Sequence, residues 1–111
     1  MYIFGSQASG RTTPSSDVDV AVLTERAPSA LERLDIAEDL SGIVGRDVDL
    51  VILDDASPII AMQVLRSGQL VIDADPHARA ELEIRTLTAY ADLKRVRQSI
   101  EQALARRMSN G

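Results

Sequence analysis

The sequence predicts an α/β (α+β) domain in which a small mixed β-sheet is covered by helices. Three observations predict this class. Apolar and polar residues alternate with a period of two over 17–23 and 47–53, which is typical of strands. Helix-start patterns follow each segment, so strands and helices alternate along the chain. A length of 111 residues with 45% hydrophobic content suits a single domain with one modest core, and we expect 1–111 to form it.

The first half of the chain is expected to hold three strands and one helix. Residues 1–4 are a short apolar segment that indicates the end of a strand, and the small polar residues of 6–16 indicate a loop. After the strand at 17–23, Ser29 and Glu32 have the spacing of a capping box, which predicts the start of a helix. Gly45 is placed to end that helix, and the strand at 47–53 follows.

The second half is expected to hold two helices around a short strand. Ser57-Pro58 predicts a helix that runs to Gly68, because serine caps a helix and proline suits its first turn. The segment 69–72 is a short strand, and Asp75-Pro76 begins a long C-terminal helix over about 76–107.

Apolar residues form a stripe along the second half of this last helix: Leu93, Val96, Ile100, Ala103 and Leu104. Two interpretations stay open. The stripe packs along its own domain, or it packs against a helix of a partner and joins the chain into a homo- or hetero-oligomer.

Composition excludes several classes of protein. The chain has no cysteine, so disulfide frameworks and thiolate metal sites are excluded. No apolar run reaches the length of a membrane span and no signal-peptide pattern is present, so we expect a cytoplasmic protein without membrane contact. The net charge of −5 and the aromatic content of 3% argue against direct nucleic-acid binding.

Acidic residues occupy one face of each of the two clearest strands. Asp17 and Asp19 are two residues apart and therefore project to the same side. Neighbouring carboxylates repel each other, and a divalent cation such as Mg²⁺ removes that repulsion. If the strand at 47–53 pairs beside the first, Asp49 can complete the site, with Asp47 as the reserve candidate.

The loop before these aspartates has the composition of a phosphate-binding segment. Glycines at 5 and 10 allow sharp turns and close approach of the backbone to a ligand. Free backbone amides can hold a phosphate, Ser6 adds a hydroxyl donor, and Arg11 adds a guanidinium. Carboxylates that bind metal beside a phosphate seat predict phosphoryl or nucleotidyl transfer.

Three separated elements together resemble the signature of the DNA polymerase β-like nucleotidyltransferase superfamily. They are Gly5-Ser6, Gly10, and the run Ser16-Asp17-Val18-Asp19. The segment Val48-Asp49-Leu50-Val51 resembles the strand that carries the third acid of that family. The downstream run from Pro58 to Val71 is similar to the minimal nucleotidyltransferase (MNT) antitoxins, and the resemblance extends to about residue 95.

The resemblance implies a polymerase β-like fold and a role for each matched residue. Gly5, Ser6, Gly10, Arg11 and Ser16 would bind the nucleotide, which is ATP in this family. Asp17, Asp19 and Asp49 would hold two Mg²⁺ ions, and Asp49 would also help to deprotonate the acceptor. The resemblance further implies an antitoxin that transfers AMP from ATP to a tyrosine of a HEPN-domain ribonuclease toxin.

One departure from the family pattern keeps other functions open. Many relatives have arginine before the second glycine, where this chain has Ser9, and Arg11 follows Gly10 instead. The alternatives are a non-catalytic antitoxin that masks the HEPN partner and a nucleotidyltransferase that acts on a small molecule. The choice of nucleobase cannot be predicted, because no aromatic or amide cluster indicates a base pocket.

Overall fold

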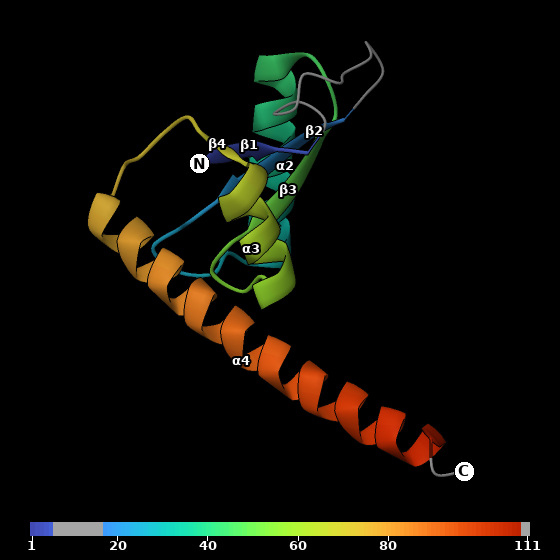
Figure 1. The fold of residues 1–111 in the computed structure, drawn as a ribbon. Helices are drawn as coiled ribbons and strands as arrows, with labels where there is room; N and C mark the ends of the chain where they lie inside the picture. Colours follow the sequence, from blue (N-terminus) through green and yellow to red (C-terminus); the bar gives the residue numbers. More distant parts are fainter. Residues whose placement is uncertain (6–16, 110–111) are drawn as a thin grey trace.

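The computed structural model of the chain describes residues 1–5 and 17–109. Within these residues, four strands form one mixed sheet and three helices lie around it (Figure 1). The strands are β1 (Tyr2–Phe4), β2 (Val18–Val22), β3 (Val48–Ile52) and β4 (Gln69–Leu70), and the helices are α2 (Ala30–Val44), α3 (Pro58–Ser67) and α4 (Pro76–Ser109). The predicted class, a mixed sheet with helices and a long last helix, is confirmed. The expected loop at 6–16 lies outside the described residues.

The strands lie in the order β3-β2-β1-β4 across the sheet. β1 is antiparallel to both β2 and β4, whereas β2 and β3 are parallel and are connected through α2. A parallel pair needs such a long connection, because the chain must return to the same end of the sheet. β4 is shorter than the predicted strand 69–72, although the N–H groups of Val71 and Ile72 both donate to the Met1 carbonyl, at 2.9 and 3.3 Å.

The predicted caps define both ends of α2. Ser29 accepts a hydrogen bond from the Glu32 amide, and the Glu32 carboxylate accepts one from the Ser29 amide. Gly45 ends the helix with a φ of 72°. The helix has no buried residue, and Leu31 and Leu34 are exposed. Leu31, Leu34, Ala37 and Leu40 follow one another at intervals of three residues. This interval falls short of the 3.6 residues of one turn, so the row drifts around the helix instead of forming one buried face.

The core lies between the sheet and the helices α3 and α4. α3 begins at Pro58 after the Ser57 cap, as predicted, and buries Ala61, Met62 and Val64. Figure 1 places α2 and α3 on opposite sides of the sheet. A single cluster of buried residues joins the sheet to both C-terminal helices: Tyr2, Phe4, Ala21, Leu53, Ala61, Val64 and Leu82.

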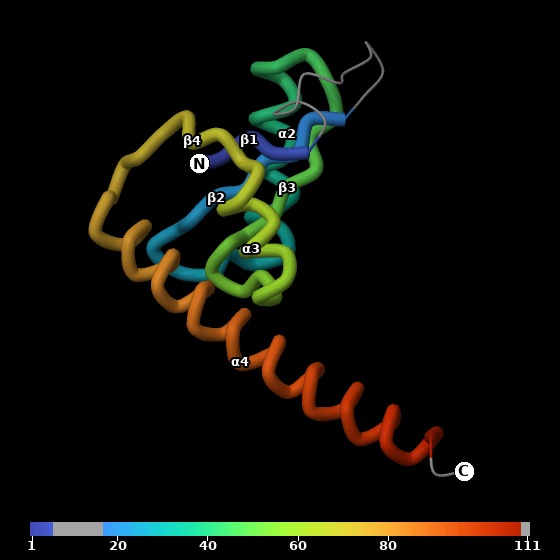
Figure 2. The backbone as a smooth tube through the Cα atoms, viewed as in Figure 1, coloured from blue at the N-terminus to red at the C-terminus, as the bar shows by residue number. Residues whose placement is uncertain are grey.

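α4 is a 34-residue helix that extends far beyond the sheet (Figures 1 and 2). Asp75 caps its start, because its carboxylate accepts a hydrogen bond from the Ala78 amide at 3.1 Å. Only Leu82 and Thr86 of the helix are buried. The predicted helix 76–107 is thus confirmed and continues to Ser109. No helix in the described part of the chain is both long and apolar enough to span a bilayer.

Candidate active site

One face of the sheet changes from acidic to apolar along β2 and β3. Asp19 and Ala21 share this face of β2, because residues two apart on a strand point the same way. Ala21 is fully buried in the core cluster, whereas Asp19 is half-buried. On β3, Asp49 and Val51 repeat this order, and Val51 packs against the same core cluster. The first residue on this face of each strand is therefore an aspartate, and the next one supports the core.

The register of the strands brings three candidate positions together. Asp19 lies opposite Asp49 in the parallel pair β2–β3 and opposite Phe4 in the antiparallel pair β1–β2. Gly5 directly follows Phe4, so Asp19 lies between the end of β1 and the start of β3. The expected pairing of the two acidic strands is thereby confirmed.

Gly5 is the residue that allows Asp19 to approach the end of β1. Its φ is +69°, in the left-handed region that favours glycine. A Cβ built on Gly5 would collide with the Asp19 carboxylate. Both the backbone conformation and the available space therefore require glycine at this position.

Asp19 is the acid of this site whose pKa is shifted by its surroundings. Burial raises the pKa of its carboxyl group above the ordinary value of 3.8, and the negative charges of Asp49 and then Asp17 raise this pKa further. The Asp19 and Asp49 side chains are close enough to share a hydrogen bond when one is protonated. The negative charges of Asp49 and Asp17 thus oppose the ionisation of Asp19.

The remaining candidate positions are placed as follows. Asp17 is exposed at the entry to β2. Asp47, the reserve candidate, lies before β3, where its backbone carbonyl accepts a hydrogen bond of 2.9 Å from the Val18 amide. Asp49, and not Asp47, is the β3-side acid whose charge acts on Asp19. The candidate nucleotide-binding residues beyond Gly5 lie outside the described residues, and they are Ser6, Gly10, Arg11 and Ser16.

The donor set of this site suits a hard cation that a ligand helps to hold. In residues 1–5 and 17–109, no three acidic, histidine or cysteine side chains are placed to hold a metal ion by themselves. Mg²⁺ commonly binds one or two carboxylates and takes its other ligands from phosphate oxygens and water. Asp19 and Asp49 match that requirement as a pair, and the charge of Asp17, just before β2, also acts on Asp19.

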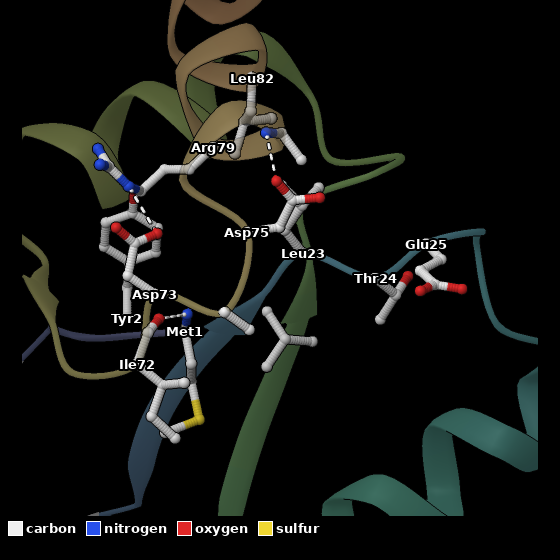
Figure 3. Close-up of a pocket in the computed structure, with 13 residues that line it drawn as sticks. Met1, Tyr2, Leu23, Thr24, Glu25, Ile72, Asp73, Asp75, Arg79 and Leu82 are labelled. Atoms are coloured by element: carbon white, nitrogen blue, oxygen red, sulfur yellow. Dashed lines mark hydrogen bonds and ion pairs between the residues drawn. The ribbon is translucent and has the colours of Figure 1, made fainter.

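A cavity of about 440 Å³ lies at the opposite end of β2 (Figure 3). Met1, Tyr2, Thr24 and Arg79 are among its lining residues. Arg79 is held by ion pairs to Asp73 at 2.9 Å and to Glu83 at 2.8 Å. No sequence pattern indicated this cavity, because it forms between segments that are distant in the chain. The cavity is separate from the acidic site, and its Arg79 and Asp73 are paired with each other.

Comparison with known proteins identifies the family. The family model described as "Polymerase beta, Nucleotidyltransferase" matches residues 1–77, which include β1, β2, β3 and all three aspartates. This chain belongs to the polymerase beta nucleotidyltransferase family. The matched range also contains Gly5 and the four candidate residues of the loop.

Two curated relatives of this nucleotidyltransferase carry the name "Protein adenylyltransferase MntA". The one from Shewanella oneidensis is 31% identical over 100 residues, which are 90% of this chain and 71% of that protein. The one from Thermococcus cleftensis is 39% identical over 64 residues, which are 58% of this chain and 65% of that protein.

Solved structures of toxin–antitoxin complexes share the fold. A chain of a toxin–antitoxin crystallised with AMP-PNP matches with a TM-score of 0.80 and 30% identity, over 94% of this nucleotidyltransferase and 83% of that chain. Another match is a complex of an MNT antitoxin with a tri-AMPylated HEPN toxin from Shewanella oneidensis. Its TM-score is 0.72 at 28% identity, over 94% of this chain and 80% of that chain.

Proposed function

We propose that this nucleotidyltransferase transfers AMP from ATP to a tyrosine of a cognate HEPN ribonuclease toxin and acts as the antitoxin of the pair. The relatives support this function, since two are named protein adenylyltransferases and a similar complex contains an AMPylated HEPN toxin. The observation that carries the proposal is the position of Asp19, which lies against Gly5 and in register with Asp49.

In the proposed reaction the tyrosine oxygen attacks the α-phosphorus of ATP. A new oxygen–phosphorus bond forms, the bond between the α-phosphorus and the bridging oxygen breaks, and pyrophosphate leaves with that electron pair. The Asp49 carboxylate accepts the phenolic proton. Gly5 lets the backbone come close to the triphosphate, and Ser6, Gly10, Arg11 and Ser16 would complete its binding.

The acidic site would also hold the metal that such a transfer needs. Two Mg²⁺ ions bound through Asp17, Asp19 and Asp49 would neutralise charge on the triphosphate and lower the pKa of the attacking hydroxyl. The phosphate oxygens would supply the ligands that the carboxylates leave open. Closely spaced acids beside a glycine are consistent with this use, because they are unfavourable in the absence of a cation.

The test uses the purified protein, its cognate toxin, ATP and Mg²⁺. We expect intact-mass measurement of the toxin to show one or more AMP adducts that map to tyrosine. Asp19→Asn should abolish the adduct, whereas Asp35→Asn, which removes the same charge from an exposed position on α2, should not. If the toxin is bound but never modified, AMP transfer is refuted.

A masking antitoxin is the second candidate function. It is favoured by Ser9, which stands before Gly10 where many relatives have arginine, so that contact of an arginine with phosphate is shifted or lost. Replacing both Asp17 and Asp19 by alanine separates the two functions in cells. Masking predicts that the double variant still protects cells from the toxin, whereas AMP transfer predicts that protection is lost.

A further inference from the structure

The buried face of α4 continues beyond the domain that buries it. Leu82 and Thr86 on this face are covered by the core. At 3.6 residues per turn, each residue turns the helix by about 100°, and four later large apolar residues then point within roughly 40° of Leu82. These four residues form the distal stripe of α4, and they are Leu93, Val96, Ile100 and Leu104.

No part of the described chain covers the distal stripe. The exposed fractions of Leu93, Val96, Ile100 and Leu104 are 41%, 57%, 55% and 54%. Figures 1 and 2 show the C-terminal half of α4 projecting clear of the sheet and of the other helices. A row of apolar side chains on a projecting helix indicates a contact surface for another molecule.

The positive charge around the distal stripe favours an acidic partner over a second copy of this chain as the molecule that binds there. Residues 94–107 carry five basic residues and one acidic residue, whereas the rest of the chain carries 7 basic and 16 acidic residues. Two copies packed stripe to stripe would bring two segments of net charge +4 together, which costs energy. A partner with acidic flanks would gain from the same arrangement.

The basic residues are distributed unequally around the helix. Arg97 and Arg107 point within about 60° of Leu82, so they border the distal stripe. Arg95 and Arg106 point to the other side, at least about 120° away. Arg97 has a partner on its own helix, with its Nε 3.1 Å from Glu101, but its side chain is still 80% exposed.

A small hollow between α3 and α4 includes Tyr90, which lies about one helical turn before the distal stripe. A cavity of about 280 Å³ is lined there by Ile59, Met62 and Tyr90. The Arg66 guanidinium lies 5.1 Å from the centre of the Tyr90 ring, which fixes one wall of the hollow. An apolar side chain of a docked helix could therefore anchor where the stripe leaves the domain.

We propose that the distal stripe is the docking surface for an amphipathic helix of the HEPN toxin, with acidic residues beside its apolar face. This inference rests on the proposed function, because that function supplies the partner. Docking on α4 would hold the toxin by a surface separate from the acidic site. Binding and AMP transfer can consequently be disrupted independently.

The experiment measures the affinity of the full-length protein for the purified cognate toxin in the absence of ATP. Ile100→Glu should weaken binding by at least about tenfold, as loss of a central interface residue commonly does. Ile84→Glu is the matched control, because Ile84 is 67% exposed on the opposite face of the same helix. Thermal unfolding should be unchanged in both variants, since neither side chain contacts the core.

A second pair of variants tests the charge argument. Arg97→Glu with Arg107→Glu should weaken binding at low salt, and the loss should shrink as salt is raised. Arg95→Glu with Arg106→Glu makes the same change in net charge on the other side of α4 and should weaken binding less. Equal effects of the two pairs would overturn the assignment of acidic flanks to this face.

Three further outcomes overturn the inference in distinguishable ways. If Ile100→Glu binds and modifies the toxin like the wild type, the docking surface lies elsewhere and the proposed function stands. If sedimentation of the protein alone shows a dimer that Ile100→Glu dissociates, a second copy covers the stripe. If the wild type neither binds nor modifies the toxin, the proposed function itself fails.

Discussion

Replacement of Gly5 by alanine tests whether the end of β1 is shaped around Asp19. The chain offers a matched control, because Gly45 has nearly the same backbone conformation, with a φ of +72° against +69° for Gly5. The two glycines differ in their surroundings. A Cβ on Gly45 would meet nothing within 4 Å, whereas one on Gly5 would collide with the Asp19 carboxylate.

The expected costs follow from this difference. A residue with a Cβ in the left-handed region costs about 1 kcal/mol, so Gly45→Ala should lower the free energy of unfolding by about that amount. Gly5→Ala carries the same cost plus that of moving Asp19 or β1, which is about 1–3 kcal/mol for an overpacked site. At roughly 4 °C per kcal/mol, we expect Tm to fall by about 4 °C for Gly45→Ala and about 8–16 °C for Gly5→Ala.

Thermal and urea unfolding measure the stability of each variant, and an assay of AMP transfer shows whether its acidic site is still active. Gly5→Ala should also lose transfer activity, because Asp19 must leave its position, whereas Gly45→Ala should retain it. In an Asp19→Ala background the collision disappears, since the Asp19 Cβ would lie 3.5 Å away, and Gly5→Ala should then cost no more than Gly45→Ala. Equal costs of the two glycine variants in the wild-type background would refute this account of the site.

Two other predictions concern stability. Because the pKa of Asp19 is raised in the folded state, its ionisation opposes folding, so this part of the stability is present below pH 3.8 and is lost as pH rises through the raised pKa. Without Mg²⁺, Asp19→Asn should therefore unfold at a higher temperature than the wild type at pH 7 but not at pH 3. Asp35→Asn is the control. If Asp19→Asn raises Tm at pH 7 by no more than Asp35→Asn does, the proximity of Asp49 to Asp19 is contradicted. Val64 is 0% exposed, so Val64→Ala should lower the free energy of unfolding by about 2 kcal/mol. Val96→Ala on the projecting part of α4 should leave that free energy unchanged or raise it slightly, as measured by chemical denaturation.

Local chemistry was sufficient to predict most element boundaries. The capping box at Ser29, the glycine that ends α2 and the Ser57-Pro58 start of α3 act within a few residues of the chain, and each has the predicted role. The period of two in β2 and β3 likewise predicts which residues share a face. The leucines of α2 did not predict a buried helix face, because the exposure of a side chain depends on which other parts of the fold pack against its helix.

The sequence by itself determined the elements, the acids available to the site and the family signature, because these depend on neighbouring residues. Only the tertiary structure decided that Asp49 lies in register with Asp19, that the Asp19 carboxylate rests on Gly5, and that the face of α4 is buried at Leu82 but exposed at Ile100. Each of these contacts depends on strand register or on the edge of the core. Both are set by interactions between distant parts of the chain, which no local pattern records.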